Sequence, residues 1–108
     1  MSSPDLQRQL VALREGYAER LPARAEMLAE IAAVLAQRWD ATAAIELKRH
    51  LHNLAGSGAS YGFPDVSHAA RAAEDACSAA LAGGPSPPLA PLMSALAALA
   101  DAVAKAQS

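Results

Sequence analysis

The sequence predicts an all-α protein, and its composition and periodicity carry that prediction. Hydrophobic residues fill 53% of the 108 positions, but aromatic residues fill only 4%. Much of the apolar content is alanine, which is the best helix former and a poor strand former. Apolar residues also recur at spacings of three and four. Because short connections between amphipathic helices favour antiparallel neighbours, we expect an up-down-up-down four-helix bundle with an additional N-terminal covering helix.

The first two expected helices lie before residue 40. Pro4 opens the first one, at about residues 4–20. Its apolar stripe consists of Leu6, Leu10, Leu13 and Tyr17. Pro22 suits the first turn of a second helix, which should end near Trp39. We expect the first helix to cover the bundle that the other four helices form.

The remaining three helices complete the bundle. Asp40 is the expected N-cap of a third helix, which runs to the break that begins at Tyr61. Pro64 starts a fourth helix, which ends at the Gly- and Pro-rich stretch 83–88. The last helix follows from Leu89 onward. No repeat or composition shift divides the chain, so residues 1–108 are expected to form a single domain.

Charge and composition exclude several classes of function. A net charge of −2 gives no basic surface for nucleic acid or anionic lipid. No apolar stretch approaches the roughly 18 residues that a membrane span requires, and the N-terminus has no signal-peptide pattern. The single cysteine, Cys77, suits a buried apolar position in a reducing compartment. We therefore expect a cytoplasmic protein that binds neither nucleic acid nor membrane.

The third helix carries the strongest candidate for chemistry, His52. At about 100° per residue, the apolar positions of this helix fall on the side opposite His52, so the imidazole should face solvent. Five residues lie within roughly 60° of it on the same face. They are Lys48, Arg49, Ala55, Gly56 and Ala59. Two cations therefore precede His52 and three small residues follow it, which suits a nucleophilic imidazole that a large phosphoryl donor must approach closely.

The segment from His52 to Gly62 resembles the signature of the histidine-phosphotransfer (HPt) family. That signature reads His, any residue, Leu or Ile, Lys or Arg, Gly, Ser or Ala, and a second Gly six residues after the first. The matching positions are His52, Leu54, Gly56, Ser57 and Gly62. The resemblance implies a bacterial two-component phosphorelay in which His52 accepts a phosphoryl group from, and donates it to, the aspartate of a receiver domain. It also implies that Glu74, on the next helix, presents a polar side chain towards that histidine.

One position departs from the family pattern, because the basic residue three positions after the histidine is Ala55 here. We expect Lys48 and Arg49, one turn before His52, to support the phosphoryl charge instead. Ala55, Gly56, Ala59 and Glu74 should then form the partner-access and docking surface. Ile45 lies near the same face, either as an apolar rim for docking or covered by the preceding helix or loop.

The other titratable residues have structural interpretations. His50 should lie half-buried at the core boundary, and His68 should be exposed on the fourth helix. Arg71 should form an exposed cluster of ion pairs with Glu74 and Asp75. A metal site formed by the three histidines is a weak hypothesis, because His50 and His52 point in different directions from one helix.

The resemblance also implies partners for the chain, and two other functions were compared with it. It implies a response-regulator receiver domain and a hybrid histidine kinase as partners, with Mg²⁺ on the receiver and no cofactor on this chain. An ATP-using kinase is excluded because no Gly-rich nucleotide loop or acidic magnesium site is present. A non-catalytic adaptor that binds a receiver or kinase domain without phosphotransfer remains the alternative, with Ala55 as its only sequence indication.

Overall fold

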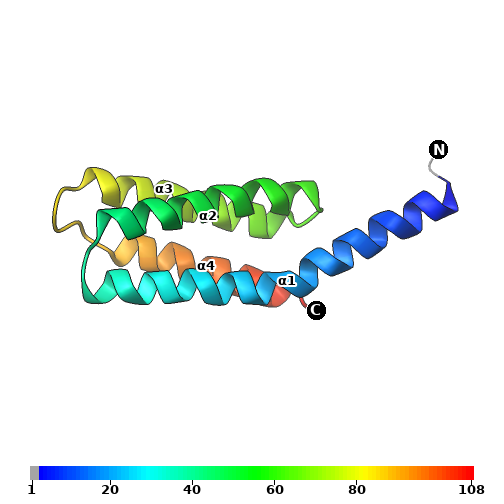
Figure 1. Ribbon diagram of the computed structural model, residues 1–108, viewed down its shortest axis with the longest axis horizontal. Helices are drawn as coiled ribbons and strands as arrows, with labels where there is room; N and C mark the ends of the chain where they lie inside the picture. Colours follow the sequence, from blue (N-terminus) through cyan, green and yellow to red (C-terminus); the bar gives the residue numbers. More distant parts are fainter. Residues whose placement is uncertain (1–2) are drawn as a thin grey trace.

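The computed structural model describes residues 3–108. In this range all of the regular secondary structure is α-helical, as predicted. Residues 1 and 2 lie outside the described range. The helices are α1 (Pro4–Gln37), α2 (Ala41–Ser60), α3 (Pro64–Ala82) and α4 (Ala90–Lys105). Figure 1 shows the helices side by side, with successive helices joined at alternating ends. The molecule extends over 54 × 21 × 19 Å.

The predicted boundary between the first two helices is wrong, because α1 runs without interruption through Pro22. Proline has no backbone N–H, so the carbonyl of Ala18, four residues earlier, loses its helical donor. The side chain of Gln107 replaces that donor, since its Nε2 lies 3.1 Å from the Ala18 oxygen. The C-terminal end of the chain therefore satisfies the carbonyl that Pro22 leaves open, and α1 continues as one helix.

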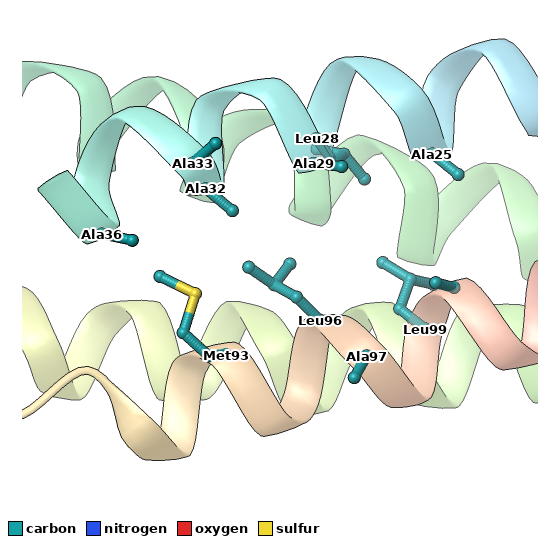
Figure 2. Close-up of a pocket in the computed structure, with 11 residues that line it drawn as sticks. Ala25, Leu28, Ala29, Ala32, Ala33, Ala36, Met93, Leu96, Ala97 and Leu99 are labelled. Carbon is teal, nitrogen blue, oxygen red and sulfur yellow. The ribbon is translucent and has the colours of Figure 1, made fainter.

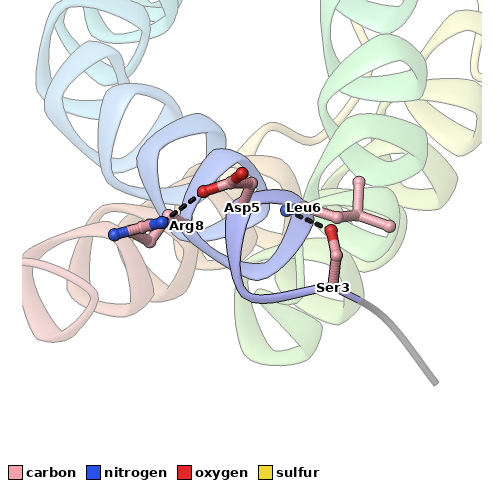
Figure 3. Close-up of polar contacts among 4 residues, drawn as sticks. All are labelled: Ser3, Asp5, Leu6 and Arg8. Atoms are coloured by element: carbon pink, nitrogen blue, oxygen red, sulfur yellow. Dashed lines mark hydrogen bonds and ion pairs between the residues drawn. The ribbon is translucent and has the colours of Figure 1, made fainter.

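The N-terminal part of α1 does not cover the bundle, which corrects the second prediction for this region. Residues 4–15 are all exposed, and Figure 1 shows this part of α1 extending away from the other helices. Local contacts hold its first turn (Figure 3). The Ser3 hydroxyl accepts a hydrogen bond from the Leu6 N–H at 3.1 Å, and Asp5 pairs with Arg8.

An aromatic cluster attaches α1 to the turn between α2 and α3. Tyr17 stacks on Tyr61 with 4.6 Å between ring centroids, and Phe63 lies beside it at 5.6 Å. The Tyr17 hydroxyl is 2.8 Å from the Ser57 Oγ. The Arg14 guanidinium covers the Phe63 ring at 4.2 Å. The bundled part of α1 therefore begins at about Arg14.

Small residues let α2 and α3 approach each other closely. A Cβ added to Gly58 would lie 3.1 Å from the Ser67 backbone nitrogen, so the two backbones almost touch. The Cys77 thiol donates to the Ala44 carbonyl at 3.2 Å near the other end of the pair. Leucines supply most of the large side chains in the core. Those with the least exposure are Leu21, Leu35, Leu47, Leu51, Leu54, Leu92 and Leu99. The close contact fixes which α3 residues face His52.

Alanines between α1 and α4 leave an apolar groove, on the side of the bundle away from the α2–α3 pair (Figure 2). Leu28, Leu96 and Met93 lie in it, and short alanine side chains supply most of the remaining lining. Within residues 3–108, no helix combines the length and the apolar character needed to cross a membrane.

Candidate functional site

His52 projects from α2 into solvent and is held by one residue of α3. Its side chain is 73% exposed, as the helical periodicity predicts. The imidazole Nδ1 lies 2.9 Å from the Glu74 Oε2, whereas the Glu74 side chain is only 18% exposed. A carboxylate accepts hydrogen bonds, so Nδ1 carries the proton in this contact. The lone pair of a neutral imidazole then lies on Nε2, which is the nitrogen farther from Glu74.

A hollow beside the imidazole is lined by residues of both helices. The lining residues are His52, Ala55 and Gly56 from α2 and Arg71, Glu74 and Asp75 from α3. No atom outside the local helix lies within 4 Å of a Cβ built on Gly56. The space next to His52 is therefore open to an approaching group, and a side chain at position 56 would take up part of it.

Ala55 is less accessible than its position on the His52 face predicts. The residue is only 3% exposed, because α3 packs against this part of α2. The buried Ser67 hydroxyl donates to the Ala55 carbonyl at 2.6 Å. Ala55 therefore forms the floor of the hollow, and the expectation that it offers an open docking surface is wrong. Ala59, one turn further along, is exposed.

Neither of the two predicted phosphate-supporting cations lines the hollow. Arg49 is exposed and Lys48 is half-buried. Burial raises the pKa of the Cys77 thiol, and the nearby positive charge of Lys48 partly opposes that increase. Lys48 thus lies towards Cys77, one turn of α3 beyond Glu74. Ile45 is 59% exposed, so no neighbouring element covers it.

The other two histidines lie apart from this site. The His50 side chain is 20% exposed, and its Nε2 is 3.7 Å from the Glu46 Oε1. His68 is exposed on α3. Both placements agree with the sequence analysis. Among residues 3–108, no three His, Cys, Asp or Glu side chains are grouped in a way that could hold a metal ion.

The surroundings of Arg71 differ from those that the sequence predicted. Its predicted ion pairs with Glu74 and Asp75 are not found among the described residues. Its side chain is exposed and lines the hollow beside His52. The sequence contains no signal for this placement, because it depends on how α2 and α3 align.

Comparison with known families gives one match. The family model described as "Hpt domain" matches residues 13–106. No curated protein and no solved structure matches the chain. The matched range contains the whole of α2, α3 and α4, and it begins near the point where α1 joins the bundle.

Proposed function

Because the chain belongs to the Hpt domain family, we propose that it exchanges a phosphoryl group between the His52 imidazole and the aspartate of a response-regulator receiver domain. Hpt domains act with receiver domains and histidine kinases in two-component phosphotransfer. The observation that carries the assignment to His52 is its combination of 73% side-chain exposure with a 2.9 Å contact from Nδ1 to Glu74. That combination leaves Nε2, the nitrogen farther from Glu74, as the available nucleophile.

The transfer step requires only groups that the two partners supply. The Nε2 lone pair forms the N–P bond while the bond from phosphorus to the aspartate oxygen breaks, and its electron pair returns to the carboxylate. The Nδ1 proton stays on the ring and remains hydrogen-bonded to Glu74, whose negative charge stabilises the positive charge that the ring gains. The receiver would contribute Mg²⁺ and its acidic pocket, and the reverse transfer follows the same path.

A docking surface surrounds this nucleophile in the proposal. Gly56 and Ala59 leave room for the receiver, and the exposed Ile45 provides an apolar contact at the rim, since apolar contacts dominate the centres of most interfaces. Lys48 and Arg49 add positive charge at the edge that would face the acidic pocket of the receiver.

The proposal is tested by incubating the chain with each purified, phosphorylated receiver domain of its source organism. We expect an acid-labile, base-stable label on the chain with at least one receiver. The label should vanish in His52→Gln and persist in the matched variants His50→Gln and His68→Gln. Label retained in His52→Gln, or no label with any receiver, would rule the proposal out.

The Glu74 contact has its own test. Glu74→Ala removes a charge-assisted hydrogen bond, a contact worth about 1.5–3 kcal/mol, so transfer should slow by about tenfold or more. Glu74→Gln keeps an acceptor oxygen and should be slowed less. Equal rates in wild type and Glu74→Ala, measured in a single turnover, would show that the carboxylate does not assist transfer.

An adaptor that binds a receiver without transfer is the second candidate, and Ala55 in place of a basic residue favours it. It predicts a complex with a receiver that forms equally well in His52→Gln, with no label on the wild-type chain. The phosphotransfer assay with a parallel binding measurement separates the two functions.

A further inference from the structure

We propose that Arg71 of α3 contacts the phosphoryl group and supplies the positive charge that Ala55 of α2 lacks. This inference rests on the proposed function of His52 and names a further residue of the same site. It assigns Arg71 a role that replaces the surface ion pairs expected from the sequence.

The alignment of α2 with α3 places Arg71 opposite Ala55. The two helices are antiparallel, because the contacts Ala44–Cys77, His52–Glu74 and Ala55–Ser67 descend along α3 as they ascend along α2. Ala55 lies three residues after His52, and Arg71 lies three residues before Glu74. Starting from the His52–Glu74 contact, one turn along both helices therefore places Arg71 opposite Ala55.

Arg71 and Ala55 also line the same hollow, together with His52. Ala55 is 3% exposed and forms its floor, whereas Arg71 is exposed at its α3 side. Arg71 from α3 and Ala55 from α2 therefore border the same space beside His52. A group bound to the imidazole and lying in this hollow would border Arg71 on the α3 side, whereas a longer residue at position 55 would border it on the α2 side.

The charges that line the hollow also favour a role for Arg71. The lining contains two carboxylates, Glu74 and Asp75, and Arg71 is its one permanently cationic member within the described part of the chain. A phosphoryl group carries a charge of about −1.5 to −2 at neutral pH, so these carboxylates would repel it. Arginine offers paired N–H donors that match phosphate oxygens, and no ion pair with a described residue occupies them here.

Lys48 is the competing cation, and its position distinguishes it from Arg71. It lies one turn before His52, outside the hollow, and its charge is felt at Cys77. A phosphoryl group in the hollow would extend towards Gly56 and Arg71, away from Lys48. Arg71 is therefore the better placed of the two.

Single-turnover transfer from a phosphorylated receiver, measured over a range of receiver concentrations, tests the assignment. Arg71→Gln should lower the maximal rate constant by about tenfold or more, the effect of losing a charge-assisted hydrogen bond. The receiver concentration that gives half-maximal rate should change little. Arg71→Lys keeps the charge and should recover much of the rate, while Arg38→Gln, which removes an equal charge from the exposed C-cap of α1, should match wild type.

Relocating the charge tests the geometry. Adding Ala55→Lys to Arg71→Gln should raise the maximal rate above that of Arg71→Gln alone, with circular dichroism confirming that the double variant folds. If the double variant does not fold, the recovery by Arg71→Lys decides. A folded double variant with no recovery would overturn the claim that positions 55 and 71 serve one site.

Other outcomes would overturn the role itself. A wild-type rate in Arg71→Gln, or a loss confined to the half-maximal concentration, would make Arg71 a spectator or a docking contact. A loss in Lys48→Gln but not in Arg71→Gln would assign the charge to Lys48. Failure of the proposed function is separate, because the wild-type chain would then remain unlabelled.

Discussion

At the scale of single residues, two glycines of α2 that lie two positions apart have opposite surroundings. A Cβ on Gly56 would meet open space, whereas a Cβ on Gly58 would lie 3.1 Å from the backbone nitrogen of Ser67. Both glycines reduce helix stability relative to alanine by about 0.5–1 kcal/mol. Gly58 is therefore required for packing, and the structure gives Gly56 no packing role.

Alanine at these two positions should separate stability from transfer. We expect Gly56→Ala to raise the free energy of unfolding by about 0.5–1 kcal/mol and to slow phosphotransfer, because its methyl group occupies the space beside His52. Gly58→Ala should lower stability by about 1–3 kcal/mol through overpacking against α3. Urea unfolding and single-turnover transfer measure both effects. A Gly56→Ala variant with an unchanged transfer rate would show that this space is not used.

The buried thiol of Cys77 gives a prediction for pH dependence. Burial raises the pKa of this thiol, so the folded state holds the proton more tightly than the unfolded state does. Its contribution to stability is therefore complete below the unfolded pKa of about 8.5 and is lost as the pH rises above that value. The stability difference between wild type and Cys77→Ala should become less favourable to wild type from pH 8 to pH 10. A difference independent of pH would contradict this account.

The sequence predicted the exposure of His52 but not the residues around it. The periodicity of one helix tells which of its own side chains face solvent, and it placed His50, His52 and His68 correctly. It does not fix the alignment of two helices along their axes. The burial of Ala55 beneath α3 and the position of Arg71 opposite it depend on that alignment, and so they emerge only from the structure.

At the scale of elements, α1 shows why a local signal failed. Pro22 is a strong indication of a helix start, because its missing N–H is harmless in a first turn. The donor that makes it harmless inside α1 comes from Gln107, 85 residues later in the chain (22 to 107). No local pattern could predict that contact.

The Gln107 contact predicts a coupling between two distant positions. Gln107→Ala should lower the free energy of unfolding by about 1 kcal/mol in wild type, because the Ala18 carbonyl then loses its donor. In a Pro22→Ala background the N–H of residue 22 serves that carbonyl, so Gln107→Ala should cost much less. A double-mutant cycle in urea measures the difference. Additive effects of the two substitutions would contradict the proposed exchange of donors.

The groove between α1 and α4 offers a test of packing in the other layer. Ala36 lies at one end of the groove, near Met93 (Figure 2). Ala36→Leu should cover apolar surface and raise stability by about 0.5–1 kcal/mol. Ala23→Leu, the same change at an exposed α1 position outside the groove, is the matched control and should have little effect. Equal effects in the two variants would show that the groove is not filled.

At the scale of the whole molecule, α1 has an exposed part and a bundled part. Residues 4–15 are exposed, and the family match begins at residue 13. Tyr17 is 3% exposed within the aromatic cluster. The exposed part therefore adds little to the stability of the bundle, although its large apolar side chains Leu6, Leu10, Val11 and Leu13 face solvent.

Removing residues 1–12 should leave both the bundle and its activity intact. We expect a melting temperature within about 3 °C of the full chain, a shift of less than about 1 kcal/mol, and an unchanged transfer rate. Tyr17→Ala, which removes a buried ring from the same helix, should cost about 3 kcal/mol or more. A truncated chain that unfolds as readily as Tyr17→Ala would show that the exposed part supports the fold.

The all-α class could be predicted from composition, and most helix boundaries from the positions of proline and glycine. These two residues act through the local backbone, so their effect can be read from the sequence. The observed start of α3 at Pro64 and the end of α2 near Tyr61 are examples. The path of the N-terminal part of α1 could not be predicted in this way. Its apolar stripe predicted burial, but the other three helices do not extend alongside this segment and offer it no surface (Figure 1).

The most direct test of the whole account identifies the nitrogen that receives the phosphoryl group. Nitrogen-15 NMR of the labelled chain, after transfer from a phosphorylated receiver, resolves the two imidazole nitrogens of His52. We predict phosphorus on Nε2 and a retained proton on Nδ1, as the 2.9 Å contact with Glu74 requires. Phosphorus on Nδ1, or on any residue other than His52, would contradict the account.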